Sequence, residues 1–261
     1  MSATIHTAVL TGLLLAASSA WGFQPLITDD TGTQGHGENQ LEFSFSRDRV
    51  EQGGLSSTTR VLPLTYTRGL SETVDIAFSV NHTSLSTNAP GVADISGSGN
   101  PVVGLKWRFH ENEASKTSFA LKGEVSLPVD QNQEALGLGS AETSYTVTAI
   151  LAQETSFGAV LANIATGRTR YHDTLNNPDT STVRLSIAPV WQITEQWKMA
   201  LDLGTEIESA AGNQTHTEFL VLGIVYSPDK DIDVAFGLTQ RNDHSGASST
   251  GVSGGVTWRF R

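Results

Sequence analysis

Apolar residues alternate with polar or small residues along most of the chain. In the stretch VDIAFSVN, for example, Ile76, Phe78 and Val80 are separated by Ala77 and Ser79. A period of two is typical of a β-strand, because successive side chains point to opposite faces. After the first 22 residues no stretch shows a helical period, and none has the roughly 18 consecutive apolar residues of a transmembrane helix. The pattern therefore predicts an all-β chain.

About twelve such segments follow one another, each about 9 to 13 residues long, which is enough to cross a bilayer when the strand is tilted. Their apolar positions fall within residues 41–45, 62–66, 74–80, 103–109, 119–127, 145–151, 157–161, 183–191, 197–207, 220–226, 232–238 and 252–260. The seventh segment is the weakest. We take Ala159 and Leu161 as its apolar face, although Val160, Ala162 and Ile164 compete for that role.

The predicted connections alternate between short turns and long loops. The short ones are residues 68–73, 110–116, 153–156, 194–196 and 227–231, and the long ones include 83–99, 128–140, 171–181, 209–216 and 241–250. Short turns at one end and long loops at the other are typical of bacterial outer-membrane barrels. A soluble meander has no reason to keep this order.

Aromatic residues gather beside the predicted short turns and at the C-terminus. Amphipathic rings are favoured at a membrane interface, where the body of the ring is apolar and one edge is wet. We therefore expect an interface girdle that includes Tyr66, Trp107, Phe109, Trp191, Trp197, Tyr226, Trp258 and Phe260.

The face opposite the apolar one carries small residues and charges of both signs. In a soluble sandwich the apolar face would fill the core, whereas in a membrane barrel it meets lipid and the polar face lines the lumen. The girdle, the connections and these charges together predict a transmembrane up-and-down antiparallel β-barrel of about twelve strands. The expected lumen-lining residues are Asp75, Lys106, Arg108, Lys122, Glu124, Arg184, Lys198, Asp202, Glu206, Asp233 and Arg259.

The N-terminus predicts export. Residues 1–22 contain an apolar core followed by small residues suited to cleavage, as in a secretory signal peptide, and a buried N-terminal helix is the alternative. Residues 23–38 are expected to form a periplasmic segment that can enter the barrel mouth, and residues 39–261 the barrel itself. Asp29 and Asp30 are the candidate plug residues of that segment. Inside the lumen they would pair with Lys106, Arg108, Lys198 or Arg259, and the alternative role is cation binding.

Composition adds few chemical signals. A formal net charge of −11 argues against nucleic-acid binding, which needs a concentrated basic face. His82 and Ser84 have the spacing of the His/Ser pair of outer-membrane phospholipases, but no third catalytic partner can be assigned. The other histidines lack metal-ligand spacing, so we expect no metal site and no cofactor.

Three stretches resemble one known family of outer-membrane barrels, described as "Putative MetA-pathway of phenol degradation" and often called transporters. They are FQPLITDDTGTQGHG, GSGNPVVGLKWRF and FALKGEVSLPVD, and the resemblance covers most of the chain after residue 22. Asn163 and Glu206 also resemble polar strand positions of the family, whereas Asn100 stands where the family usually has Asp. The resemblance implies a monomeric barrel in the bacterial outer membrane that takes part in the uptake of small, often aromatic, hydrophobic compounds.

The expected function is therefore an outer-membrane channel or transporter for small solutes, which pass by diffusion through the barrel. Its expected partners are outer-membrane lipid, the solute and, during insertion, the barrel assembly machinery. Two alternatives stay open: a lipid-acting barrel enzyme that uses His82 and Ser84, and a structural or surface-interaction barrel.

Overall fold

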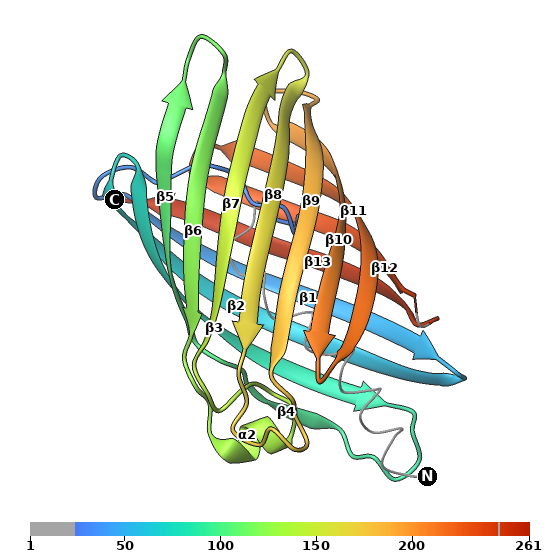
Figure 1. The fold of residues 1–261 in the computed structure, drawn as a ribbon. Coiled ribbons are helices and arrows are strands. Elements are labelled where there is room, and N and C mark those ends of the chain that lie inside the picture. Colours follow the sequence, from blue (N-terminus) through green and yellow to red (C-terminus); the bar gives the residue numbers. More distant parts are fainter. Residues whose placement is uncertain (1–23, 245) are drawn as a thin grey trace.

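The computed structural model describes residues 24–244 and 246–261, and the predicted signal peptide lies outside this range. The chain forms an antiparallel sheet closed into a barrel (Figure 1). Its strands are β1 (Asn39–Gln52), β2 (Leu55–Ser71), β3 (Val74–Thr87), β4 (Ile95–Ser98), β5 (Val102–Asn112), β6 (Thr117–Ser126), β7 (Ser144–Thr155), β8 (Gly158–Thr169), β9 (Thr180–Gln192), β10 (Trp197–Ala210), β11 (Asn213–Asp229), β12 (Ile232–Asp243) and β13 (Ser248–Phe260). One short helix, α2 (Gln131–Ala135), lies between β6 and β7.

Each wall strand pairs with its neighbours in sequence, and β1 pairs with β13 to close the barrel. The short strand β4 and the full-length strand β5 share one position in the wall, because they pair with different parts of β3. The wall is thus a closed antiparallel barrel of 12 strands, which confirms the predicted fold class. Among the described residues, no helix is long and apolar enough to span a bilayer.

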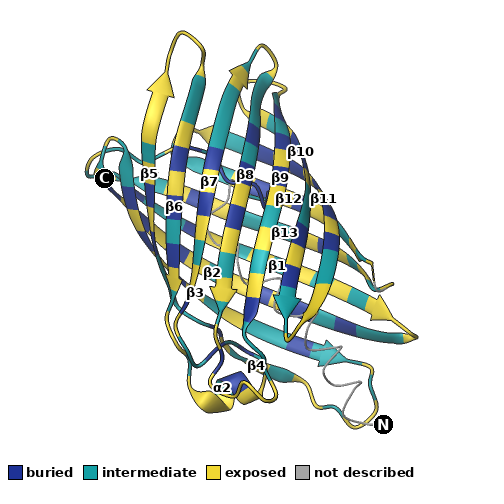
Figure 2. Cartoon of the chain, viewed as in Figure 1, coloured by how far each residue is buried: buried dark blue, intermediate teal, exposed yellow. Residues whose placement is uncertain are grey.

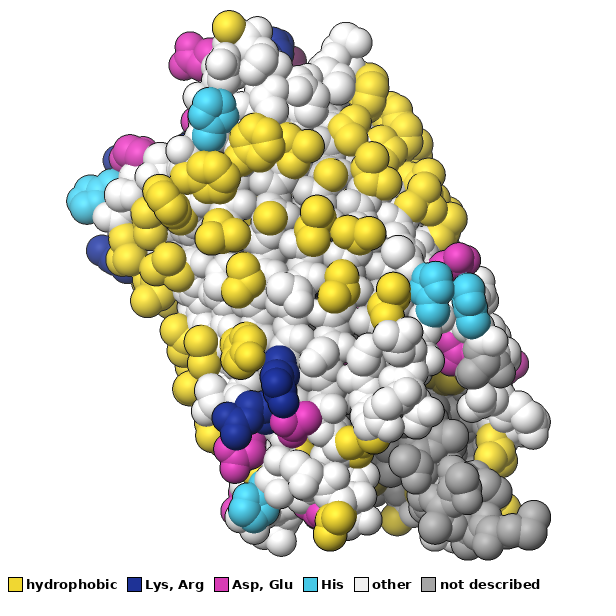
Figure 3. Space-filling model, viewed as in Figure 1, with side chains coloured by type: hydrophobic (Ala, Val, Ile, Leu, Met, Phe, Trp, Pro, Cys, Tyr) yellow, Lys and Arg dark blue, Asp and Glu magenta, His cyan; other side chains and the backbone are white. Residues whose placement is uncertain are grey.

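Burial along each strand is the reverse of the pattern in a soluble protein. On β3 the apolar Ile76 and Phe78 are exposed, whereas Asp75, Ala77 and Ser79 are buried. The same alternation gives the chequered wall of Figure 2. Apolar side chains form a broad band over the outer surface, and charged side chains gather beyond the edges of this band (Figure 3). The outer face is therefore suited to lipid and the inner face to water, as in a barrel of the bacterial outer membrane.

The predicted girdle residues lie on the outer face, near the ends of the strands that meet at the short turns. Trp107 and Trp258 are about half exposed. Ring pairs form within this set, with centroids 4.6 Å apart for Trp197 and Tyr226 and 4.5 Å apart for Trp258 and Phe260. Aromatic rings at this level suit the interface between lipid and water.

Four details of the sequence-based strand assignment are wrong. Within the long loop expected over residues 83–99, β3 continues to Thr87 and β4 occupies Ile95–Ser98. Residues 209–216 were expected to form a long loop, but β10 and β11 extend into this range and leave a two-residue turn, in which Ala211 and Gly212 both have positive φ. Residues 241–250 are likewise mostly strand. On β8 the outward phase is Val160, Ala162 and Ile164, because Leu161 is buried inside the barrel.

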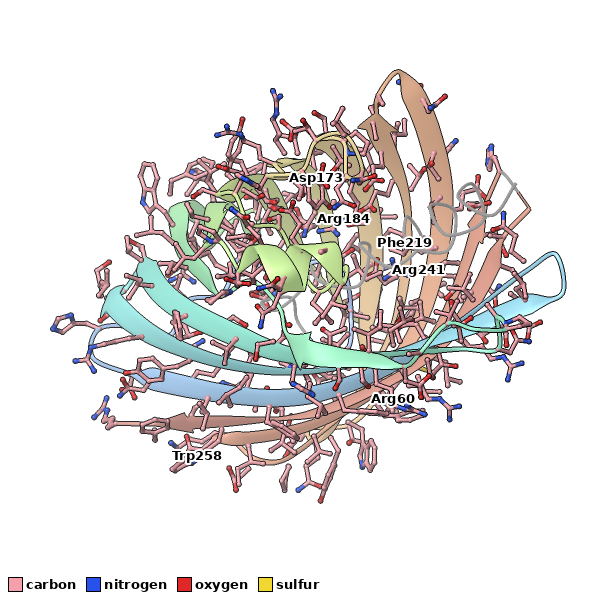
Figure 4. All side chains as sticks on the ribbon, turned by 90° about the horizontal axis from the view of Figure 1, so that it is seen from below. Arg60, Asp173, Arg184, Phe219, Arg241 and Trp258 are labelled. Carbon is pink, nitrogen blue, oxygen red and sulfur yellow. The ribbon has the colours of Figure 1, made fainter. Side chains whose placement is uncertain are left out.

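The long connections at one end cover part of the barrel mouth, where α2 lies (Figures 1 and 4). The buried carboxylate of Glu134 accepts hydrogen bonds from the backbone N–H groups of His172 and Asp173, at 3.1 and 2.8 Å. The amide of Asn100 donates to the carbonyl oxygens of Leu127 and Ser140, both at 2.7 Å. These contacts join three separate connections into one cap.

Candidate functional site: a strap inside the barrel

Residues 24–38, which we call the strap, run along the inner face of the wall before β1 begins. The strap meets the strands one after another. Gln24 lies against Gly255 of β13, and Pro25 lies against Gly223 of β11 and Gly237 of β12. Further on, Gln34 approaches β3 and Gly35 approaches β2 through contacts described below. The strap therefore follows much of the inner circumference instead of crossing the lumen once.

Glycines on the inner face of the wall leave room for the strap. A Cβ atom added to Gly223 or to Gly237 would lie 2.8 Å from side-chain atoms of Pro25, closer than real Cβ contacts. A Cβ atom on Gly69 of β2 would lie 1.7 Å from the carbonyl oxygen of Gly35. The glycines of the inner face thus allow the backbone and proline ring of the strap to approach the strands closely.

An apolar cluster inside the barrel holds the next part of the strap. Leu26 and Ile27 are buried against wall side chains that point inward. The wall members of this cluster are Leu161, Ala188, Val190, Ala200, Phe219 and Val221. Figure 4 shows Phe219 projecting from its strand into the barrel. These inward apolar residues would face water if the strap were absent, so their burial depends on it.

Asp202 on β10 binds the strap backbone directly after this cluster. Its carboxylate is fully buried and accepts hydrogen bonds from the N–H of Ile27 at 2.7 Å, the N–H of Thr28 at 2.8 Å and the hydroxyl of Thr28 at 2.6 Å. Hydrogen bonds to a charged acceptor contribute more than neutral ones. Asp202 therefore fixes the position of Thr28 within the barrel.

Asp29 is the electrostatic centre of the strap. Its carboxylate oxygens lie 3.0 Å from Nζ of Lys106 and 2.8 Å from Nζ of Lys122, and all three side chains are nearly inaccessible to solvent. Burial raises the pKa of the Asp29 carboxyl, but the two ammonium groups outweigh burial and hold this pKa below its ordinary value. Once the Asn163 amide is oriented to suit its neighbours, it binds both the N–H and the carbonyl group of Asp29.

The rest of the strap is held by contacts with β6, β5, β3 and β2. The hydroxyl of Thr31 lies 2.6 Å from that of Ser118 on β6. Lys106 on β5 also donates to the carbonyl oxygens of Asp30 and Gly32, at 3.1 and 3.3 Å. The N–H of Gln34 lies 3.1 Å from both carboxylate oxygens of Asp75.

The predicted plug residues are thus inside the barrel, but their partners differ in part from those expected. Lys106 pairs with Asp29 as expected and lies 3.8 Å from Asp30. Arg259 instead pairs with Asp233 at 2.6 Å, and Arg108 lies 3.4 Å from Glu111. The cation-binding alternative for Asp29 has no support, because lysine ammonium groups occupy its carboxylate.

The eleven predicted lumen residues all lie on the inward phase of their strands. The strap contacts Asp75, Lys106, Lys122 and Asp202, while Glu124 lies 3.5 Å from Lys122. Arg184 lies 3.5 Å from Glu206 near the mouth, and Figure 4 shows it pointing into the barrel. Lys198 lies on the inward phase at the short-turn end of β10.

Four charged residues on the same inner face are not among the predicted lumen residues: Glu42, Asp48, Glu208 and Arg241. Glu42 and Glu208 follow the alternation of their strands and could have been included, whereas a separate cause explains each of the other two. On β1 the outward positions after Phe45 are Arg47 and Arg49, so the alternation between apolar and polar residues disappears there. Arg241 was assigned to a loop, although the inward phase of β12 continues to it and Figure 4 shows its side chain inside the barrel.

Among the cavities that the described residues form, two lie along the inner wall between the strap and the capped mouth. The larger has a volume of about 160 Å³ and is lined by wall residues and the cap, among them Val61, Val102, Leu138, Ala165 and Arg184. The smaller, of about 110 Å³, is lined by residues of the strap from Gln24 to Ile27 and by Arg241. Val61, Asn81 and Val102 line both cavities, so the two are neighbours along the inner wall.

His82 and Ser84, the candidate catalytic pair, lie on the outward phase of β3 opposite Leu62 and Arg60 of β2. The hydrogen bonds found among the described residues include none between these two side chains. The geometry therefore gives no specific support to a lipid-acting enzyme.

A closed wall, an apolar outer belt and a polar interior together define an outer-membrane β-barrel. Residues 25–260 match the family model described as "Putative MetA-pathway of phenol degradation", and the chain belongs to this family. No curated protein matches the sequence.

Solved structures of low sequence identity share the fold. An outer membrane channel from Pseudomonas putida F1 has a TM-score of 0.70 at 13% identity, covering 88% of this chain and 98% of that one. The β domain of the Bordetella autotransporter BrkA has a TM-score of 0.57 at 11% identity, covering 85% and 99%. The translocator domain of the autotransporter NalP from Neisseria meningitidis has a TM-score of 0.52 at 11% identity, covering 98% and 97%.

Proposed function

We propose that this chain is an outer-membrane channel for small solutes, and that the strap forms its constriction. The observation that carries the proposal is a polar inner wall narrowed by a segment that is held by specific contacts yet leaves open cavities beside it. A barrel with a purely structural role has no need of an interior that keeps both a polar wall and free space.

We propose further that the solutes are small and include hydrophobic or aromatic compounds, which diffuse passively. The family description supports this, since it refers to phenol degradation. Cavity size supports it as well. The larger cavity of about 160 Å³ is comparable to an engineered apolar cavity of about 150 Å³ that binds benzene. Its lining combines apolar side chains with many hydroxyl groups, which suits a ring that bears a polar substituent.

The channel and its constriction can be tested together. Deletion of residues 24–38 should raise single-channel conductance in planar bilayers, because the deletion opens the lumen along the inner circumference. Liposome swelling with phenol, benzoate and aliphatic solutes of similar size would measure selectivity. Glu113→Ala, in the short turn between β5 and β6, is the control and should conduct like the wild type.

The outcomes separate the parts of the proposal. Equal conductance of the deletion variant and the wild type, with both barrels folded by circular dichroism, would show that the strap is not the constriction. Absence of conductance and swelling in both proteins would reject the channel itself. Equal swelling rates for aromatic and aliphatic solutes would reject only the proposed solute class.

A further inference from the structure

Two histidines and one glutamate come together on the outer surface, where β11 begins and β12 ends, at the end of the barrel opposite the short turns. They are His216, Glu218 and His244, and one ligand atom from each lies within 4.8 Å of the others. His216 and Glu218 share the outward phase of β11, opposite Ile207 and Thr205 of β10. His244 directly follows β12. This group is separate from the strap and from the cavities, so the inference does not depend on the proposed function.

The backbone holds His244 beside His216. The N–H of His244 donates to the carbonyl oxygen of His216 at 3.1 Å, and the two imidazole ring centroids are 4.3 Å apart. A carboxylate oxygen of Glu218 lies 3.8 Å from Nε2 of His244. Figure 3 shows two histidine side chains next to an acidic one at one edge of the outer surface. Strand pairing and this backbone hydrogen bond therefore fix the backbone positions of the cluster, although sequence spacing gives no sign of it.

One of the imidazoles is also oriented. Nε2 of His216 lies 2.5 Å from the hydroxyl oxygen of Thr205. When Nε2–H donates to this hydroxyl, Nδ1 is unprotonated and can bind a metal. A metal-bound histidine commonly donates its other ring N–H to an oxygen acceptor in this way, which fixes its tautomer and ring orientation. Thr205 therefore has the place of a positioning residue for a metal ligand.

We propose that His216, Glu218 and His244 form a binding site for a divalent transition-metal ion such as Zn²⁺. Two imidazole nitrogens and one carboxylate match the ligand preference of zinc, with a fourth position left for water. Zinc bonds of about 2.0–2.2 Å would place the ligand atoms about 3.4 Å apart. The side chains of Glu218 and His244 are 64% and 61% exposed, so they are free to move inward by the distance required.

The bound ion would join β11 to the connection between β12 and β13. Mg²⁺ and Ca²⁺ prefer sets of oxygen ligands and are not expected to bind here. Because metal bound only by the folded barrel stabilises it, zinc should also raise the melting temperature.

The test uses the mature barrel in detergent, purified without a polyhistidine tag. Competition of ZnCl₂ with a chromogenic chelator should show one zinc ion per barrel. His216→Ala and His244→Ala should abolish this binding, and Glu218→Gln should weaken it. Thr205→Val should weaken it by about tenfold, as expected for loss of an orienting partner. His172→Ala is the matched control. Nδ1 of His172 also lies near a carboxylate, 3.7 Å from Glu142, but no second histidine is beside it.

A footprint on the unmodified chain keeps the proposal testable if a variant fails to fold. Zinc should protect His216 and His244, but not His172, from modification by diethyl pyrocarbonate, as read by mass spectrometry. The proposal is overturned if zinc does not bind, if His216→Ala and His244→Ala bind it like the wild type, or if all three histidines react equally with and without zinc.

Discussion

Inside the barrel, buried side chains of opposite charge pair with one another and hold the strap in position. Asp29 illustrates this, because its carboxylate lies between the ammonium groups of Lys106 and Lys122. A buried pair of this kind is weak evidence for stability, since desolvation offsets much of the attraction. Its effect is on position: the strap is placed where the carboxylate meets both lysines.

This view predicts the effect of removing both lysine charges. The double variant Lys106→Met, Lys122→Met leaves the Asp29 carboxylate buried without its two cationic partners. Breaking a buried ion pair in this way destabilises a fold by about 3–5 kcal/mol, because an uncompensated charge stays buried. We expect the strap to leave its place. The chain has no cysteine, so Thr31→Cys provides a single labelling site on the strap. Maleimide should label this site faster in the double variant.

Addition of Asp29→Asn supplies the control for this experiment. The amide keeps the shape of the side chain and removes the unpaired charge, so labelling of Thr31→Cys should return toward the slow rate. If the double variant is labelled as slowly as its parent, the lysines do not position the strap.

Asn163 shows what can be learned from sequence at this scale. The phase expected for its strand, with Ala159 and Leu161 outward, placed Asn163 outward as well, although its side chain is buried inside the barrel. Its resemblance to a polar position of the family could be predicted. Its role could not, because it binds the backbone of Asp29, and the partner of a side chain does not follow from alternation along its own strand.

At the scale of elements, the wall and the strap fit each other through glycine. Gly223 and Gly237 lie on neighbouring strands and both face Pro25. Gly123 on β6 differs, because a Cβ atom added there would meet nothing within 4 Å. A side chain can therefore be added at the outward Gly123 without a clash, but not at the inward Gly223 or Gly237.

Gly223→Val should displace the start of the strap, since the new side chain would overlap the ring of Pro25. Overpacking of this kind costs about 1–3 kcal/mol. The expected results are higher single-channel conductance and a lower midpoint of urea unfolding. Gly123→Val introduces the same β-branched residue into open space and should leave both quantities unchanged. Similar behaviour of the two variants would contradict the close fit described for the strap.

Most strands could be predicted, because alternation is strong wherever the outer face meets lipid and the inner face meets water. The prediction was wrong on β8 for a physical reason. Leu161 points inward and is buried by Leu26 and Ile27, which come from a distant part of the sequence. An apolar residue covered by the strap therefore resembles an apolar residue that faces lipid, and the period of the strand cannot distinguish them.

At the scale of the whole molecule, the barrel depends on one seam between its first and last strands. Asn39 of β1 is paired with Phe260 of β13, and Leu41 with Trp258. The rings of Trp258 and Phe260 pack together on the outer face beside this seam. Arg261 extends beyond the last strand, and its side chain is largely exposed beside Glu38.

The seam predicts different effects of two small changes at the C-terminus. Phe260→Ala removes a ring from the seam and the membrane interface, so we expect less folded barrel in outer-membrane fractions. Deletion of Arg261 removes an exposed ion pair, which contributes little, and should leave the amount unchanged. Heat-modifiable mobility on gels measures the folded fraction. Equal amounts of both variants would contradict this role of Phe260.

The course of the strap has a consequence for the order of assembly. Residues 24–38 directly precede β1 in the sequence and lie along the inside of the other strands. The wall therefore encloses them once β1 and β13 have paired. A segment held at so many points around a closed ring cannot enter sideways. The strap must therefore be laid down while the sheet is still open, or thread in afterwards from one end, and pairing of the seam becomes the step that traps it.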